Sequence, residues 1–238
     1  MQDEAFSWRQ WNQGAAATFP IAVAAVPIGL VCGALAAERG MSLTQIGLMS
    51  ATVFAGASQF VAIGLWAEPL PIAAIVLATL MVNLRHVMMS ASIARHMDLF
   101  SPSQRYVALY GLTDEVWAFS EARALKAPLT QAYYAGLAMP LMVVWVSSTV
   151  GGGAFGKLLG DPATLGLDFV FTAMFIGLIV GFRALPSWTV VVATSAVVAA
   201  ISHQLLPSPW YIIIGGLAGV SAAAFLAPGH HARQAKEA

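Results

Sequence analysis

Long apolar runs separated by short polar turns constrain the fold of this chain more than any other feature. A helix needs about 20 consecutive, mostly apolar residues to cross the hydrocarbon core of a bilayer. The runs do not alternate apolar and polar residues, so helices are favoured over the strands of a barrel. Charged residues make up only 9% of the sequence, against about 25% in soluble domains. Most of the chain is therefore expected to lie in lipid.

Seven of these runs are predicted to be spanning helices of one all-α, polytopic membrane domain over residues 1–238. They cover residues 15–36, 44–66, 70–94, 131–150, 165–182, 188–205 and 209–227. Residues 105–122 have fewer apolar residues than a span requires. They are expected to form a half-helix, a re-entrant segment, or an eighth span shielded by protein. The domain divides into a first half over 15–94, a linker with a short helix over 95–130, a second half over 131–227, and a polar tail over 228–238.

The distribution of lysine and arginine favours seven spans, because cytoplasmic loops carry an excess of positive charge. If 105–122 does not cross, Arg9 and Lys157 face one side, and the other side carries Arg39, Arg95, Arg105, Arg123, Lys126, Arg183, Arg233 and Lys236. If it crosses, the division is more even. We therefore expect the amino terminus outside and the carboxyl terminus inside. A faint likeness between the two halves would then be an inverted repeat, with a site near mid-membrane.

The apolar run over 70–94 contains three polar side chains, Asn83, Arg85 and His86. A cation at the centre of a bilayer costs roughly 2.5–3.5 kcal/mol on insertion scales. Arg85 is therefore expected to be paired or to face an interior cavity. The alternative is an anchor whose charged end reaches the membrane surface. These three residues are the first candidates for a substrate site.

A run of small residues, Gly56-Ala57-Ser58, lies within the predicted span 44–66. One reading is a helix break, whose new amino-terminal end offers backbone N–H groups to a carboxylate. The other is close packing of two helices. Gln59 follows directly, and its amide needs partners if it is buried. Gly56, Ser58 and Gln59 are therefore candidate substrate-binding residues.

Two adjacent carboxylates, Asp114 and Glu115, lie within the weakly apolar segment 105–122. Neighbouring residues of a helix point about 100° apart, so the two acids are not expected to share one proton. One of them could pair with Arg85 or His86, or carry a proton in a cavity of low dielectric. The alternative is a helix start, with Thr113 or Asp114 as the cap and Glu115 in solvent. Both residues are candidate partners of a proton or an ammonium group.

Several classes of function are not expected. The sequence has no His-Glu-x-x-His, phosphate-binding Gly-x-x-x-x-Gly-Lys-Ser/Thr or Gly-x-Ser-x-Gly motif, so no enzyme, cofactor or metal is predicted. Its formal net charge is zero, which gives no basic surface for nucleic acid. Gly215 and Gly219 form a Gly-x-x-x-Gly spacing, which suits close packing against a partner helix or within this chain.

Four motifs taken together resemble the AzlC family, the large subunits of bacterial branched-chain amino acid exporters. They are Phe19-Pro20-Ile21 with Pro27, the run Phe54 to Phe60, Arg85-His86-Val87, and Leu112 to Trp117. The resemblance extends over about residues 15–227. It implies export of valine, leucine, isoleucine and methionine, a multi-pass position in the bacterial inner membrane, and a small separate membrane subunit of the AzlD type.

The resulting hypothesis is a secondary transporter that exports neutral, branched-chain amino acids. Arg85 or a half-helix end would bind the substrate carboxylate, and Asp114 or Glu115 would bind the ammonium or carry a proton. The alternative is a channel or a non-transporting scaffold subunit, in which the polar residues only pack helices.

Overall fold

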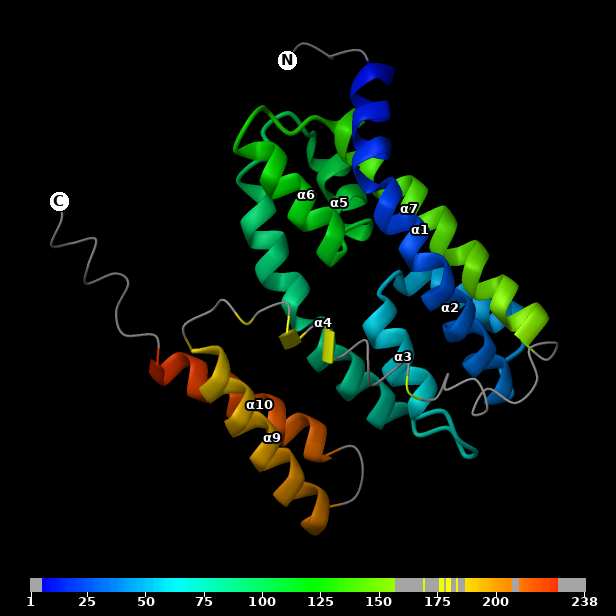
Figure 1. The fold of residues 1–238 in the computed structure, drawn as a ribbon, viewed down its shortest axis with the longest axis vertical. Helices are drawn as coiled ribbons and strands as arrows, with labels where there is room; N and C mark the ends of the chain where they lie inside the picture. The colour runs from blue at the N-terminus through cyan, green and yellow to red at the C-terminus, as the bar shows by residue number, and fades with distance from the viewer. Residues whose placement is uncertain are drawn as a thin grey trace, which may run out of the picture.

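A computed structural model describes residues 6–156, 169, 176–177, 179–180, 183, 187–206 and 210–226 (Figure 1). The regular elements in these ranges are all α-helices, as predicted. They are α1 (Trp8–Glu38), α2 (Leu43–Val53), α3 (Gly56–Gly64), α4 (Ile72–Ala94), α5 (Pro102–Tyr110), α6 (Asp114–Ala124), α7 (Gln131–Phe155), α9 (Trp188–Leu205) and α10 (Trp210–Leu226). The predicted span 165–182 lies largely outside the described residues, and so does the polar tail.

Four helices, α1, α4, α7 and α9, are long and apolar enough to cross a membrane. The apolar helices α2 and α10 are shorter. The chain is thus a helical membrane protein, which confirms the predicted fold class. The second half is described only in part, so the inverted repeat stays a prediction.

Helices α1 and α7 lie side by side and run in the same direction (Figure 1). Gly14 faces Tyr133 near the start of both helices, and Gly33 faces Thr149 in the last third of both. A methyl group on either glycine would overlap backbone atoms of α7, so the helices can approach closely only because these positions lack a side chain. Gln10 also accepts a hydrogen bond from Thr130. We call the end where both helices begin the Gln10 end, and the other the Glu38 end.

Helix α2 begins at the Glu38 end, where Leu43 and Ile46 face Gly153 of α7. It ends at Phe54, whose backbone has left-handed angles (φ 36°, ψ 45°) that a bulky residue rarely adopts. Helix α3 then folds back beside α2, and the Gln59 amide donates to Ser50 of α2 over 2.9 Å.

The segment 44–66 was expected to be one span, and this expectation is wrong. It forms a helical hairpin, α2–α3, that enters and leaves at the Glu38 end. The break predicted near Gly56 lies at Phe54–Ala55, and α3 starts at Gly56. The non-helical backbone of these two residues redirects the chain.

Helix α5 enters the bundle from the Gln10 end. The Gln131 amide at the start of α7 donates to Gln104 over 2.7 Å, and Gly111 at the end of α5 faces Ala138. Successive residues of α5 thus lie beside successive residues of α7, and the two helices run in the same direction.

Helix α6 returns to the Gln10 end beside α4. Its first residue, Asp114, pairs with Arg85, and Glu121, two turns later, contacts Ser92 and His96. Residues 102–124 therefore form a second helical hairpin, α5–α6, rather than a half-helix or a span. Of the three arrangements expected for 105–122, the structure matches the re-entrant one.

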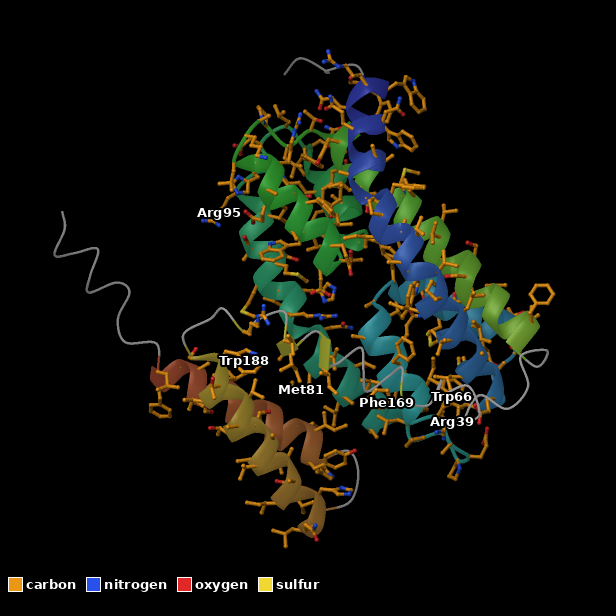
Figure 2. All side chains as sticks on the ribbon, in the orientation of Figure 1. Arg39, Trp66, Met81, Arg95, Phe169 and Trp188 are labelled. Atoms are coloured by element: carbon orange, nitrogen blue, oxygen red, sulfur yellow. The ribbon has the colours of Figure 1, made fainter. Side chains whose placement is uncertain are left out.

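The two hairpins enter from opposite ends and meet inside the bundle, where the Tyr110 hydroxyl donates to the carbonyl of Ala51. Because α2–α3 returns to the Glu38 end, α4 runs from the Glu38 end to the Gln10 end, opposite to α1. Arg9 therefore lies at the same end as Arg95 and Lys126, and Arg39 lies at the other. This corrects the predicted sides of Arg9 and Arg39, and Figure 2 shows Arg39 and Arg95 at opposite ends.

Helices α9 and α10 form an antiparallel pair near α4 (Figure 1). The Ser195 hydroxyl donates to the carbonyl of Gly215 over 2.8 Å, and Gly219 also faces Ser195. At the other end the rings of His203 and Tyr211 are 4.8 Å apart. The Gly-x-x-x-Gly face thus packs within this chain.

Candidate functional site

A cavity of about 170 Å³ lies where the two hairpin tips meet. This is about ten times the room that one water molecule needs. It is lined by Ile21, Ala25 and Ile28 of α1, Phe54 to Ala57 at the α2–α3 tip, Arg85 and His86 of α4, Thr113 to Glu115 at the α5–α6 tip, and Leu141 and Trp145 of α7. Five of the eight predicted site residues, Gly56, Arg85, His86, Asp114 and Glu115, are among them.

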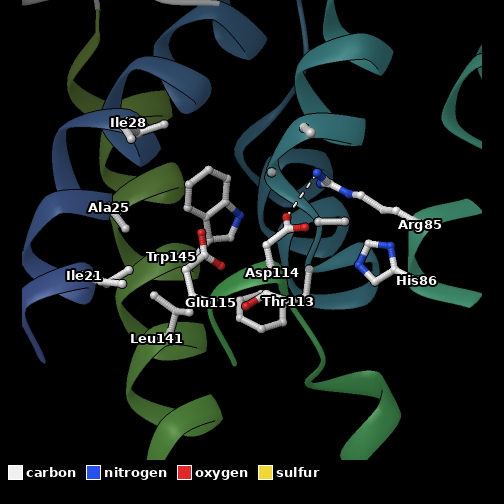
Figure 3. A pocket seen from close by; sticks show the side chains of 14 residues that line it. Ile21, Ala25, Ile28, Arg85, His86, Thr113, Asp114, Glu115, Leu141 and Trp145 are labelled. Carbon is white, nitrogen blue, oxygen red and sulfur yellow. Dashed lines mark ion pairs between the residues drawn. The ribbon is translucent and has the colours of Figure 1, made fainter. Parts of the chain in front are cut away.

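One half of the cavity wall is apolar (Figure 3). Ile21, Ala25 and Ile28 repeat every three to four residues along α1 and share one face of that helix. Leu141 and Trp145 are four residues apart on α7 and share a face in the same way. The parallel packing of α1 and α7 sets these two faces side by side. This half can accept an aliphatic group but offers few hydrogen bonds.

The start of helix α3 forms a second part of the wall. The first N–H groups of an α-helix have no acceptor within the helix, and no side chain caps this one. Gly56 and Ala57, in the first turn, both line the cavity. A methyl group on Gly56 would lie only 3.0 Å from the Trp145 ring. The backbone donors, together with the partial positive charge of the helix end, suit an anionic group.

Arg85 and Asp114 form an ion pair on the opposite wall (Figure 3). The guanidinium nitrogen lies 3.1 Å from the carboxylate, and the side chains are 25% and 34% exposed. The Arg85 Nε is buried and has no hydrogen-bond partner among the described residues. Arg85 is thus both paired and facing a cavity, and a guanidinium has five N–H donors, more than one carboxylate uses.

Asp114 and Glu115 occupy the first turn of α6, where an acid complements the helix dipole. Thr113 is the cap, since its hydroxyl accepts from the Val116 N–H over 3.3 Å. A place at a helix start and a place in the cavity are therefore compatible for both acids. Among the described residues, no His, Cys, Asp and Glu side chains gather in a way that could hold a metal ion.

His86 lines the cavity beside Arg85, and its Nδ1 lies 3.3 Å from the carbonyl of Asn83. Asn83 itself does not line the cavity. Its side-chain oxygen is buried and has no partner within the described part of the chain.

Ser58 and Gln59 lie behind the cavity wall. Ser58 is 1% exposed, and its hydroxyl donates to the carbonyl of Ala55 over 2.9 Å, which ties the break to the first turn of α3. Gln59 is also 1% exposed and hydrogen-bonds within the core. A substrate contact by Ser58, Gln59 or Asn83 stays a prediction.

The apolar wall could not be predicted from the sequence. Trp145, Leu141 and Ile21 lie in runs in which nearly every residue is apolar, so nothing distinguishes a cavity-facing residue from a lipid-facing one. A second polar group was also missed. His96 lies 3.3 Å from Glu121, which accepts from Ser92, between α4 and α6 toward the Gln10 end.

The fold defines a helical membrane protein, and inside its bundle lies a cavity that is apolar on one side and charged on the other. Comparison with known proteins identifies the family. The sequence model described as "AzlC protein" matches residues 20–159, and the chain belongs to the AzlC family. Transport is the function supported at the level of this family.

Three relatives illustrate the breadth of the similarity. An uncharacterized membrane protein of Archaeoglobus fulgidus is 34% identical and aligns over 69% of this chain and 68% of its own length. The inner membrane protein YgaZ of Escherichia coli is 28% identical, over 86% of this chain and 85% of its own. The branched-chain amino acid transport protein AzlC of Bacillus subtilis is 29% identical, over 71% of this chain and 66% of its own length. No solved structure matches the chain.

Proposed function

We propose that this protein is a secondary transporter that exports branched-chain amino acids and binds them in the cavity between the hairpin tips. The observation that carries the proposal is the division of the cavity into an apolar half and a charged half. A branched-chain amino acid has the same division, an aliphatic side chain beside a carboxylate and an ammonium group. The name of the Bacillus subtilis relative supports this substrate class.

The substrate carboxylate binds between Arg85 and the start of α3. Arg85 keeps unused donors, and the first turn of α3 offers backbone N–H groups. The ammonium group binds Glu115, which lies between Asp114 and the apolar wall in Figure 3. Asp114 neutralises Arg85 when no substrate is bound. The aliphatic side chain then packs against Leu141 and Trp145.

The Gln10 end faces the cytoplasm of a bacterial cell, with the chain in the inner membrane. Among the described residues that end carries Arg9, Arg95, Arg105, Arg123 and Lys126, whereas Arg39 lies at the Glu38 end. Positive charge accumulates on the cytoplasmic side of membrane proteins. The amino terminus is accordingly inside, the reverse of the orientation first expected. A small AzlD-type membrane subunit, implied by the family, completes the exporter.

Counterflow in proteoliposomes tests this function. Vesicles that contain the protein, with and without its small subunit, are loaded with unlabelled leucine and diluted into labelled leucine. A transporter accumulates label transiently inside the vesicles, because it exchanges internal unlabelled leucine for external labelled leucine. Internal valine or isoleucine should support the same accumulation. Lysine or glutamate inside should give no accumulation. A channel lets the labelled leucine equilibrate without an overshoot. A scaffold gives no more uptake of label than vesicles without protein. Either of the last two results would reject the proposal.

A further inference from the structure

Four polar side chains form a buried chain of hydrogen bonds behind the apolar wall. Trp145 Nε1 donates to Gln59 over 2.7 Å, and the Gln59 amide donates to Ser50 over 2.9 Å. The Thr149 hydroxyl also donates to Ser50, over 2.8 Å. Each of the four is less than 9% exposed. The network connects α2, α3 and α7 through Gln59, which bonds to both other helices.

Polar groups in such a place need an explanation, because each one costs free energy unless its hydrogen bonds are satisfied. Gln59 satisfies the single donor of the Trp145 indole. The indole ring lies 3.0 Å from the position that a methyl group on Gly56 would take, so the tip of α2–α3 confines it on the cavity side. The ring is thus held by one hydrogen bond on one side and lies against the bare Gly56 backbone on the other. That ring is the largest side chain of the apolar wall.

We propose that Gln59 is a positioning residue that sets the side-chain selectivity of the cavity by fixing the Trp145 ring. The inference rests on the proposed function, since selectivity requires a transported substrate. It assigns Gln59 an indirect role, different from the substrate contact that the sequence suggested. Without the Gln59 acceptor, the indole N–H is left unpaired in the core, and the ring turns toward the polar half of the cavity to find a partner. The shape of the apolar half then changes, while Arg85 and Glu115 keep their places.

The test uses Gln59→Met, which keeps the length of the side chain and removes both hydrogen bonds. Initial rates in proteoliposomes give KM and Vmax for alanine, valine and leucine. In a fitted apolar pocket, a substrate that lacks one methylene has a Vmax/KM lower by roughly 10–200-fold. We expect the leucine-to-alanine ratio of Vmax/KM to fall by at least about fivefold in Gln59→Met, through KM rather than Vmax. Gln59→Glu keeps an acceptor for Trp145 and should restore most of the ratio.

Gln131→Leu is the matched control, because this amide lies at the start of α7, far from Trp145 on the same helix, and donates to Gln104 and the Leu99 carbonyl. Its substrate ratio should equal that of the wild type. If Gln59→Met does not insert, Ser50→Ala gives a smaller change in the same direction. It keeps the Gln59 acceptor of Trp145 but removes the hydroxyl that holds the Gln59 amide, so the indole ring is held less firmly.

An unchanged leucine-to-alanine ratio with a lower Vmax for every substrate would make Gln59 purely structural and would overturn the inference. A wild-type protein that carries none of the three amino acids would instead reject the proposed function, so the two failures are distinguishable.

Discussion

In each of the two hairpins, α2–α3 and α5–α6, a short non-helical break forms the tip, and the first turn of the following helix lines the cavity. The chemistry of the two tips differs. The first turn of α3 contributes Gly56 and Ala57, which carry no charge, and no side chain caps it. The first turn of α6 carries Asp114 and Glu115 behind the Thr113 cap. One tip therefore presents bare backbone donors and the other presents carboxylates.

This difference predicts the orientation in which the cavity binds a zwitterionic substrate. A helix amino-terminal end attracts an anion when it is bare, and the attraction is cancelled when acidic side chains already occupy the first turn. The substrate carboxylate should therefore bind at the α2–α3 tip, and the ammonium group at the α5–α6 tip. Arg85 lies between the two tips and can pair with Asp114 or with the substrate. The predictions below test this division of roles.

The largest expected effect is the labelling pattern of the two hairpins. In a Cys32→Ser background, single cysteines at Ser42 and Glu68 flank the first hairpin, and those at Ser103 and Lys126 flank the second. Because each hairpin returns to the end from which it enters, an impermeant thiol reagent should label each pair from one face, and the two pairs from opposite faces. Labelling of Ser42 and Glu68 from different faces would mean that 44–66 crosses the membrane, and the comparison of the tips would fail.

The second prediction concerns the residue shared by both tips. Arg85→Ala should lower leucine transport by roughly 100-fold, because truncating one member of a partly buried charge pair also leaves its partner unpaired. Arg85→Lys should lose most of the activity as well, since an ammonium cannot donate to two carboxylates with the planar geometry of a guanidinium. Arg95→Lys is the control, because that side chain donates to the Ser92 carbonyl at the end of the same helix. Wild-type transport by Arg85→Ala would remove Arg85 from the site.

Much of the fold and part of this site could be predicted from the sequence. Apolar runs identified the long helices, because a bilayer requires about 20 such residues. The cost of a cation in lipid identified Arg85, and adjacent acids in a weakly apolar segment identified Asp114 and Glu115. The fold-back of 44–66 could not be predicted, because it depends on left-handed backbone angles at Phe54, a residue with no preference for them. The role of Trp145 depends on a hydrogen bond to Gln59, 86 positions away in the sequence.

The third prediction separates the two acids of the charged tip. Asp114 pairs with Arg85, whereas no ion pair of Glu115 is present among the described residues. If Glu115 exchanges the ammonium group for a proton during the cycle, Glu115→Gln should keep leucine counterflow and lose the response to an imposed pH gradient. Glu38→Gln, at the exposed end of α1, should keep both. An unchanged pH response in both Glu115→Gln and Asp114→Asn would return the two acids to a structural role at the helix start.

The smallest expected effect tests the uncharged tip with one methyl group. Gly56→Ala adds a carbon atom 3.0 Å from the Trp145 ring and next to the first N–H groups of α3, so the ring has to shift and the carboxylate is held farther from its donors. We expect the KM for leucine to rise by roughly fivefold with little change in Vmax. Gly64→Ala makes the same change at the other end of α3, where no atom lies within 4 Å of the added carbon. Its KM should equal the wild-type value, and its thermal stability should rise slightly, since alanine is the better helix former. Equal KM values in the two variants would mean that the carboxylate binds away from the start of α3, and the charged tip with Arg85 would then hold both ends of the substrate.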